Sequence, residues 1–277
     1  MLEGQTHTQT QSAAPKTQGD DAFQPFEFIP GDESAGLLLL CDHASNALPP
    51  GYGTLGLPED QLARHIGYDI GVEAVTRRLA TKLNAPALLT RFSRLLIDPN
   101  RGRDDPTLIM RLSDGAVVPG NAYIDETERE HRKKTYYDPY HTAVSETLER
   151  MHVGARTPVV FSIHSFTPNW RGVDRPWHVA ILWDQDGRLP LPLIAALEAE
   201  GDLVVGNNEP YTGELDEDTL NKHGTKRGFA HALVEVRQDL IGDVAGQDAW
   251  ADRFARLLPP ILADESLYEL NPGLEAH

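Results

Sequence analysis

Two histidines and one glutamate stand at the ends of short apolar runs in this sequence. His43 follows the run 37–42, His164 ends the run 157–164, and Glu235 lies near the end of the run 230–236. Short apolar runs are typical of buried strands. In open α/β sheets, ligands gather at the carboxyl ends of the strands. The three side chains are therefore predicted to meet at one site.

Two strand-end histidines are suited to binding one metal ion. A catalytic zinc site needs a third protein ligand, often a carboxylate, and leaves one position for water. Asp69 is the candidate carboxylate, and it lies between Gly67 and Gly71 in the segment HIGYDIG. The alternative is that each histidine bonds a neighbouring loop and that Asp69 is a solvated residue of a helix. The residues alone leave both interpretations open.

The segment 91–101 is rich in arginine and follows a predicted strand. Arg94 precedes the tetrapeptide Asp98-Pro99-Asn100-Arg101. Guanidinium groups in such a loop favour bidentate capture of a substrate carboxylate. The alternative is a solvated loop in which Asp98 and Arg101 pair with each other.

A glycine motif at 51–56, GYGTLG, has the spacing G-x-G-x-x-G. A dinucleotide fingerprint must follow its strand directly and open its helix. Here Pro49-Pro50 separates the motif from the strand, and Pro58 begins the helix. The motif therefore does not predict a dinucleotide site.

The elements that position these residues alternate between strands and helices. We expect helices at 58–83, 126–152, 191–200 and 247–258, and strands at 37–42, 86–90, 157–164, 178–183, 203–205 and 230–236. Asp125 and Glu128 have capping-box spacing, Pro139 is expected to interrupt the second helix, and Pro259-Pro260 to stop the last one. Segments 91–120 and 206–228 are expected to be loops. The alternation predicts an α/β fold with a mostly parallel or mixed sheet covered by helices on both faces.

Composition limits the classes of protein that fit. The chain has 277 residues, one cysteine and a formal net charge of −17. We expect a disordered tail at 1–22 and a single domain at 23–277. One cysteine excludes an intrachain disulfide and favours the cytoplasm. The acidic surface argues against nucleic acid and anionic membranes as partners, and no apolar run is long enough to cross a membrane.

Six motifs occur in a fixed order between Leu37 and Ile241. They are LCDHASN, YDIG, FSRLLIDPNR, DPYH, FSIHSF and HGTKRGFAHALVEVRQDLI. Together they resemble the N-formylglutamate amidohydrolase family, in its wider subgroup rather than the enzyme of histidine degradation. The resemblance implies a fold similar to the zinc-dependent exopeptidases of the carboxypeptidase type. It also implies hydrolysis of the amide of a small, anionic N-acyl amino acid such as N-formylglutamate.

The same resemblance implies roles for individual residues. One divalent ion, Zn²⁺, would be held by His43, Asp69 and His164, with Glu235 as the general base. The alternative for Glu235 is an ion pair with Arg237, which lies two residues later on the same face of the strand. Arg101 would hold the substrate carboxylate and is also expected to act in catalysis. Further candidates for substrate binding, taken from the sequence itself, are Arg94, Asn100, His223 and Arg227.

Some positions depart from the related families. Carboxypeptidases use His-x-x-Glu, whereas Asn46 stands three residues after His43. Either Asn46 or Asp69 could then be the third ligand, and the role of His141 stays open. The sequence also leaves open a homo-oligomer, another N-acyl amino acid or small peptide as substrate, and a non-catalytic, metal-free binding protein of the same fold.

Overall fold

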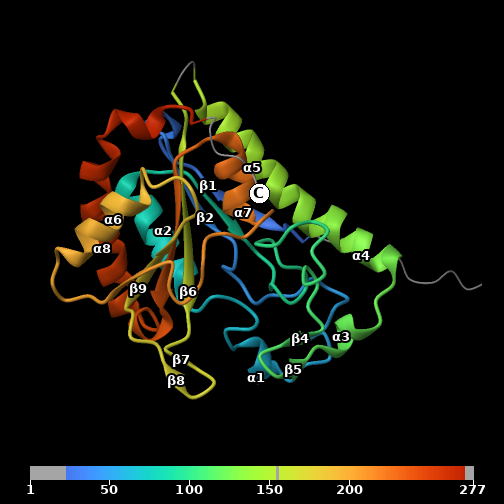
Figure 1. Ribbon diagram of the computed structural model, residues 1–277. Helices are drawn as coiled ribbons and strands as arrows, with labels where there is room; N and C mark the ends of the chain where they lie inside the picture. Colours follow the sequence, from blue (N-terminus) through green and yellow to red (C-terminus); the bar gives the residue numbers. More distant parts are fainter. Residues whose placement is uncertain (1–22, 154–155, 272–277) are drawn as a thin grey trace, which may run out of the picture.

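The computed structural model describes residues 23–153 and 156–271, so the tail expected at 1–22 lies outside the described residues. Seven strands form one mixed sheet in the order β1-β3-β2-β6-β11-β9-β10 (Figure 1). The strands are β1 (Phe26–Ile29), β2 (Leu37–Cys41), β3 (Ala87–Thr90), β6 (Val159–Phe166), β9 (Val179–Leu182), β10 (Val205–Asn207) and β11 (His231–Arg237). Strands β3, β2, β6 and β11 run parallel, whereas β1–β3 and β11–β9 pair antiparallel.

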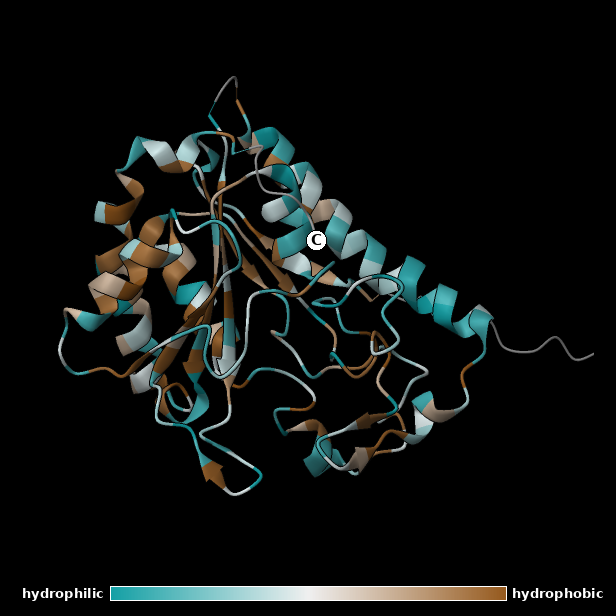
Figure 2. Cartoon of the chain, in the orientation of Figure 1, coloured by the Kyte–Doolittle hydropathy of each residue, from teal (hydrophilic) through white to brown (hydrophobic). Residues whose placement is uncertain are grey.

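Helices cover both faces of the sheet, as predicted (Figure 1). On one face lie α2 (Val72–Leu83), α6 (Pro190–Glu198) and α8 (Val244–Leu262). On the other lie α5 (Asp138–Met151) and α7 (Thr219–His223). Figure 2 shows the apolar residues concentrated along the strands and the inward sides of these helices. The predicted α/β class is confirmed.

The central strands are apolar on both faces because both faces are covered. All five residues of β2 are buried. Leu37 and Leu39 belong to the core cluster beneath α2 and α8, and Leu38 and Leu40 to the cluster beneath α5. Continuous apolar runs are the expected pattern for parallel strands buried on two sides. These buried strands form a rigid base for residues at their ends.

The helix expected at 58–83 is two helices, which corrects the prediction. The first, α1, spans only Glu59–Leu62, and α2 begins at Val72. Gly71 has φ +86°, and a Cβ at this position would lie 2.2 Å from the carbonyl oxygen of Ile241. A regular helix cannot pass through a left-handed residue in this close contact. Asp69 therefore lies in an irregular turn and not within a helix.

The helix expected at 126–152 continues past the interruption. It consists of α4 (Glu126–Arg132), a π-helical turn (Lys133–Tyr137) and α5, whose first turn contains Pro139. Asp125 caps α4 as predicted, because its carboxylate accepts a hydrogen bond from the amide of Glu128 at 2.9 Å. The π turn occurs just before the proline, which has no amide hydrogen to continue the α pattern.

Two further boundaries differ from the prediction. The last helix, α8, runs through Pro259 and Pro260 to Leu262. Its apolar side, including Phe254 and Leu258, packs on the core, and this burial outweighs the lost backbone bonds. The segment expected as a loop at 206–228 contains β10, α7 and a 3-10 turn at Thr225–Arg227.

Short elements surround the carboxyl end of the parallel strands. The long segment 91–120 contains the hairpin β4 (Leu112–Ser113) and β5 (Ala116–Val117), followed by α3 (Pro119–Ala122). A second hairpin after β6 consists of β7 (Asn169–Trp170) and β8 (Val173–Asp174). The remaining 3-10 turns are Glu33–Ala35, Gln238–Leu240 and Glu265–Tyr268. Within the described ranges, no helix has the length and apolar character needed to cross a membrane.

Candidate metal centre and active site

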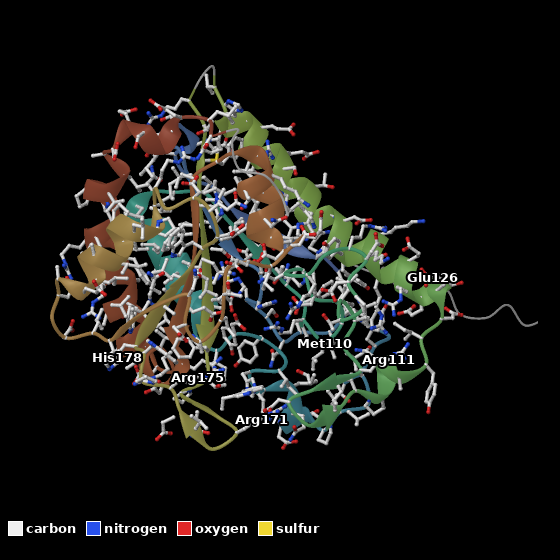
Figure 3. All side chains as sticks on the ribbon, in the orientation of Figure 1. Met110, Arg111, Glu126, Arg171, Arg175 and His178 are labelled. Atoms are coloured by element: carbon white, nitrogen blue, oxygen red, sulfur yellow. The ribbon has the colours of Figure 1, made fainter. Side chains whose placement is uncertain are left out.

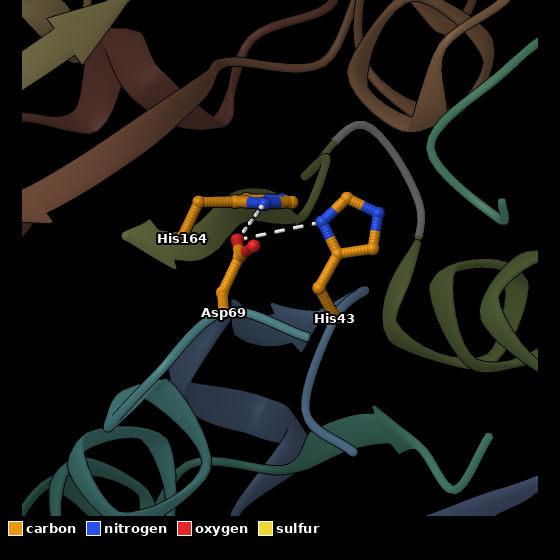
Figure 4. Close-up of side chains that lie close together, drawn as sticks. All are labelled: His43, Asp69 and His164. Carbon is orange, nitrogen blue, oxygen red and sulfur yellow. Dashed lines mark hydrogen bonds and ion pairs between the residues drawn. The ribbon is translucent and has the colours of Figure 1, made fainter. Parts of the chain in front are cut away.

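His43, Asp69 and His164 form a buried cluster at the carboxyl ends of β2 and β6 (Figure 4). Oδ2 of Asp69 lies 3.4 Å from Nδ1 of His43 and 2.9 Å from Nδ1 of His164. One ligand atom from each residue lies within 4.8 Å of the other two. Two imidazole nitrogens and a carboxylate oxygen at this spacing can hold one divalent metal ion.

Local backbone contacts bring the cluster together. His43 is the second residue after β2, and His164 is near the end of β6, its parallel neighbour. The amide of Asp69 donates to the carbonyl of His43 at 3.0 Å, so the turn before α2 is attached directly to the end of β2. The amide of Ser165 also donates to Oδ2 of Asp69 at 3.3 Å.

A second carboxylate supports each histidine from behind. Nε2 of His43 lies 2.7 Å from Oδ1 of Asp98, and Nε2 of His164 lies 3.2 Å from Oδ2 of Asp42. Metal-binding histidines almost always donate their other ring N–H to a carboxylate, carbonyl or water, which fixes the ring and raises its basicity. Both rings thus direct Nδ1 toward the shared carboxylate. The donor set and its support fit a bound metal.

The supporting carboxylates are themselves held in place. Asp42 accepts a hydrogen bond from the hydroxyl of Tyr140 at 2.5 Å. Asp98 accepts from the guanidinium of Arg94 at 2.7 Å and from the amide of Asn100 at 3.0 Å. Arg94 also reaches Oδ1 of Asp69 at 3.4 Å. Arg94 therefore neutralises buried carboxylates around the cluster.

Charges in the cluster shift its pKa values. Burial raises the pKa of a carboxyl, but His43 and His164 outweigh it and hold the pKa of Asp69 far below its usual range. Burial lowers the pKa of His164, yet hydrogen bonds to Asp42 and Asp69 raise it well above the usual value. Paired opposite charges thus stabilise one another within the protein interior.

Glu235 shares a cavity with the cluster. It pairs in register with His164 across β11 and β6, and its Oε2 is buried without a hydrogen-bond partner in the described residues. Burial raises the pKa of Glu235 to about 7. The ion pair with Arg237 considered from the sequence does not occur, because Arg237 pairs with Asp239 at 2.7 Å.

A cavity of about 550 Å³ opens over the cluster and contains most of the predicted substrate-binding residues. Arg94, Asn100 and Arg101 line it with the three candidate ligands and Glu235. Nε of Arg101 is buried and has no hydrogen-bond partner among the described residues. Asp98 does not pair with Arg101, because Asp98 is bound to Arg94 and His43.

Other predicted residues lie away from this cavity. His223 belongs to α7, not to a loop, and its Nε2 lies 2.9 Å from Nδ1 of His141. Arg227 stacks over Phe229 at 4.8 Å. Neither His223 nor Arg227 is among the residues that line the cavity. The side-chain Nδ2 of Asn46 donates to the carbonyl of Leu62 at 3.1 Å.

The sequence analysis gave no role to Asp42 and considered Asp98 only as an ion-pair partner of Arg101. Each follows an apolar stretch and stands beside a predicted site residue, Asp42 before His43 and Asp98 before the Pro99-Asn100-Arg101 segment. A carboxylate next to a candidate metal ligand is a signal for a supporting role. Which histidine each carboxylate contacts depends on how distant segments pack, so the pairing needed the structure.

An α/β sheet with a buried His-Asp-His cluster at its strand ends is typical of metal-dependent hydrolases. The family model of N-formylglutamate amidohydrolase matches residues 35–242. The chain therefore belongs to the N-formylglutamate amidohydrolase family, which confirms the resemblance seen in the motifs. These enzymes are hydrolases that act on carbon–nitrogen bonds other than peptide bonds.

Two solved structures resemble the chain over most of its length. A gene product of Agrobacterium tumefaciens is 36% identical, with a TM-score of 0.81 over 87% of this chain and 96% of that one. The N-formylglutamate amidohydrolase from Ralstonia eutropha is 22% identical, with a TM-score of 0.71 over 87% of this chain and 98% of that one. No protein of curated function matches the sequence significantly.

Proposed function

We propose that this protein hydrolyses the amide bond of a small N-acyl amino acid to give a carboxylic acid and a free amino acid. One observation carries the proposal: the buried His43–Asp69–His164 cluster and the unpartnered carboxylate of Glu235 line the same cavity. A metal site beside a base is the arrangement needed to direct water at an amide. N-formylglutamate is the reference substrate, because the family is named for it.

Zinc is the metal we propose for the cluster. Two histidines and one aspartate are a common ligand type for catalytic zinc, and both histidines already have the supporting carboxylates that such ligands require. A zinc ion bound there supplies Lewis acidity, which polarises an amide carbonyl and makes water a stronger nucleophile at neutral pH.

Glu235 is the proposed general base. Its free Oε2 can accept a proton from the attacking water and later deliver it to the leaving amine. Burial raises the pKa of Glu235 to about 7, close to the value at which a carboxyl can both accept and donate protons at neutral pH. Its position opposite His164 in the sheet fixes the carboxylate beside the cluster.

Arg101 is the proposed binder of the substrate carboxylate. Its guanidinium lines the cavity and forms no ion pair within the described residues, whereas Arg94 is occupied by Asp98 and Asp69. Asn100 lines the same wall, and its side-chain oxygen accepts from the amide of Thr219 at 3.1 Å, which anchors the loop to α7. We assign His223 to the support of this loop rather than to substrate contact.

We further propose that residues 23–277 act as one unit, that the protein works in the cytoplasm, and that its partner is a small-molecule substrate. The alternatives are a related hydrolase of small peptides and a metal-free binding protein. Metal analysis of protein purified without chelators, followed by a release assay with N-formyl, N-acetyl and dipeptide substrates, separates the three. Protein that is folded, holds no divalent metal and cleaves none of these substrates would contradict the proposal.

A further inference from the structure

The cavity extends beyond the metal cluster into a region lined by large apolar side chains. Its volume, about 550 Å³, exceeds what a formyl group and a glutamate side chain occupy. The apolar lining residues include Leu182, Leu215, Leu233, Trp170, Trp183 and Tyr211. Such a lining matches an apolar ligand group, because removing both surfaces from water stabilises the complex.

The floor of this region adjoins Glu235. Leu233 lies two residues before Glu235 on β11, so both side chains point to the same face of the sheet. Leu182 of β9 pairs in register with Leu233. The side chains next to the proposed base on this face of the sheet are therefore two leucines, and neither carries a charge.

The walls are aromatic and held in place from behind. Arg175 stacks on Trp170 at 5.5 Å and on Tyr211 at 4.9 Å, and its own side chain is buried outside the cavity lining. Figure 3 shows Arg175 on the sheet side of the site and Met110, another lining residue, on the side of the long 91–120 segment. The cationic side chain thus packs against two rings that line the cavity, and it is not itself among the lining residues.

The charges in the cavity favour a substrate with one carboxylate. Of the lining arginines, Arg94 is paired with Asp98, and Arg101 alone has no ion pair within the described part of the chain. Asp184, Asp218 and Glu235 also line the cavity. A second substrate carboxylate would be removed from water without a cationic partner and near other carboxylates, which is unfavourable.

From this lining we propose that the preferred substrate is an N-acyl amino acid with a single carboxylate and a large uncharged apolar group, aromatic or branched aliphatic. The inference rests on the proposed amide hydrolysis and narrows its substrate class. The carboxylate lies at Arg101, the scissile amide lies between the cluster and Glu235, and the apolar group occupies the region of Leu182, Leu233 and Tyr211.

The test compares kcat/KM of the full-length, zinc-loaded protein for four substrates. N-formylphenylalanine and N-phenylacetylglycine place the apolar group on the amino-acid and acyl sides, and N-formylglutamate and N-formyllysine are charged alternatives. We expect at least one apolar substrate to exceed N-formylglutamate by about tenfold or more, the usual scale of discrimination by an apolar pocket. N-formylglutamate or N-formyllysine as the best substrate would overturn the inference while supporting the proposed hydrolysis.

If none of the four is cleaved, the wider release assay decides the proposed function, and binding decides the substrate inference separately. Calorimetry with zinc-loaded Glu235→Gln protein then compares Kd for N-formylphenylalanine and N-formylglutamate. Tighter binding of N-formylphenylalanine by about tenfold is expected. Equal or weaker binding would contradict the assigned apolar site.

A charged residue introduced into the apolar region of the cavity provides a second test of the inference. Leu215 is 37% exposed, so Leu215→Arg leaves the core intact and places a second cation beside the cavity. We expect the ratio of N-formylglutamate to N-formylphenylalanine turnover, or of their binding constants, to rise about tenfold. Tyr123→Arg is the matched control, because Tyr123 is 97% exposed and outside the lining. An unchanged ratio in folded Leu215→Arg protein would remove this region from the binding site.

Discussion

Two pairs of buried histidines lie in this molecule, and their surroundings differ. His43 and His164 meet edge to face at 4.9 Å, and each ring contacts two carboxylates. His141 and His223 are stacked at 5.2 Å, and neither ring bonds to a carboxylate. The pKa values of the first pair are raised and those of the second pair are lowered.

The second pair forms a directed chain of hydrogen bonds. Nε2 of His141 lies 3.0 Å from the carbonyl of Pro99, so this nitrogen must carry the proton that it donates. Nδ1 of His141 is then an acceptor, and Nε2 of His223 donates to it at 2.9 Å. Nδ1 of His223 is left without a partner among the described residues. Both imidazoles are therefore neutral, and they hold the loop that contains Asp98 and Arg101.

Burial alone therefore does not give a histidine the surroundings expected of a metal ligand. Both pairs are buried, and both lie near the carboxyl end of the sheet. Only the first pair shares a carboxylate oxygen between its rings and has an acid behind each ring. The four predictions below test whether these carboxylates distinguish a pair of histidines that binds a metal ion from a pair that supports a loop.

The largest effect is expected from removing a proposed ligand. His164→Ala should lower metal affinity and turnover more than a hundredfold, because outer-sphere partners alone contribute about 10- to 100-fold. Metal content is measured on dialysed protein by elemental analysis, with circular dichroism to check the fold. His223→Ala is the matched control and should retain its metal. A His164→Ala protein with stoichiometric metal would remove His164 from the ligand set.

Replacement of the proposed base should lower turnover with the metal retained. Glu235→Gln keeps the shape of the side chain but cannot accept a proton, so kcat should fall at least about a hundredfold. The release assay and metal analysis are run on the same preparation. Near-normal turnover with full metal content would contradict the role of the base. Loss of metal would mean that Glu235 is itself a ligand.

A smaller effect is expected from weakening one supporting carboxylate. Asp98→Asn keeps a hydrogen-bond acceptor for Nε2 of His43 but removes the negative charge, so metal affinity should fall about 10- to 100-fold. Competition with a chelator of known affinity measures the change. Asp138→Asn, which alters a surface carboxylate paired with Arg103, is the control and should leave the affinity unchanged. Equal affinities of the Asp98→Asn and wild-type proteins would contradict the supporting role.

The smallest effect is expected on the free energy of unfolding, whose pH dependence includes a contribution from His223 of the second pair. Burial lowers the pKa of His223 to about 3, so the unfolded chain binds a proton below about pH 6.5 that the folded state does not. The buried neutral His223 therefore does not lower the free energy of unfolding above about pH 6.5, and it lowers that free energy increasingly as the pH falls toward 3. His223→Gln keeps the donor to His141 and should reduce the slope between pH 4 and 6 by about 1.4 kcal/mol per pH unit.

Urea unfolding at several pH values in this range measures that slope. His131→Gln serves as the control, since His131 is exposed and should leave the slope unaltered. An identical slope in the His223→Gln and wild-type proteins would show that His223 is protonated in the folded state.

Several features of the site could be predicted because they depend on local patterns. Apolar runs indicated where β2, β6 and β11 end, and this placed His43, His164 and Glu235 at one edge of the sheet. The helix cap at Asp125 was also predictable from residues three positions apart. Strand ends and caps follow from short-range chemistry, so a sequence alone carries them.

The remaining features depend on contacts between distant segments. The break before α2 arises where Gly71 meets the carbonyl of Ile241, 170 positions later in the chain. The partners of Asp42 and Asp98, and the packing of Tyr211 on Arg175, likewise join separate elements. Composition cannot specify such pairings, and for the same reason the apolar side of the cavity was not predicted.

The π turn at Lys133–Tyr137 sets the rotational phase between α4 and α5. Before it, Arg132 donates to the carbonyl of Leu96 and the side chain of Asn121, and after it Tyr140 reaches Asp42. The turn holds one residue more than an α-helical turn, so if the same residues formed plain α-helix, one helix would be rotated about 100° relative to the other. One of the two sets of contacts would then face solvent. The π geometry of this turn therefore keeps the contacts of Arg132 and the contact of Tyr140 with Asp42 on the inward side of one continuous helix.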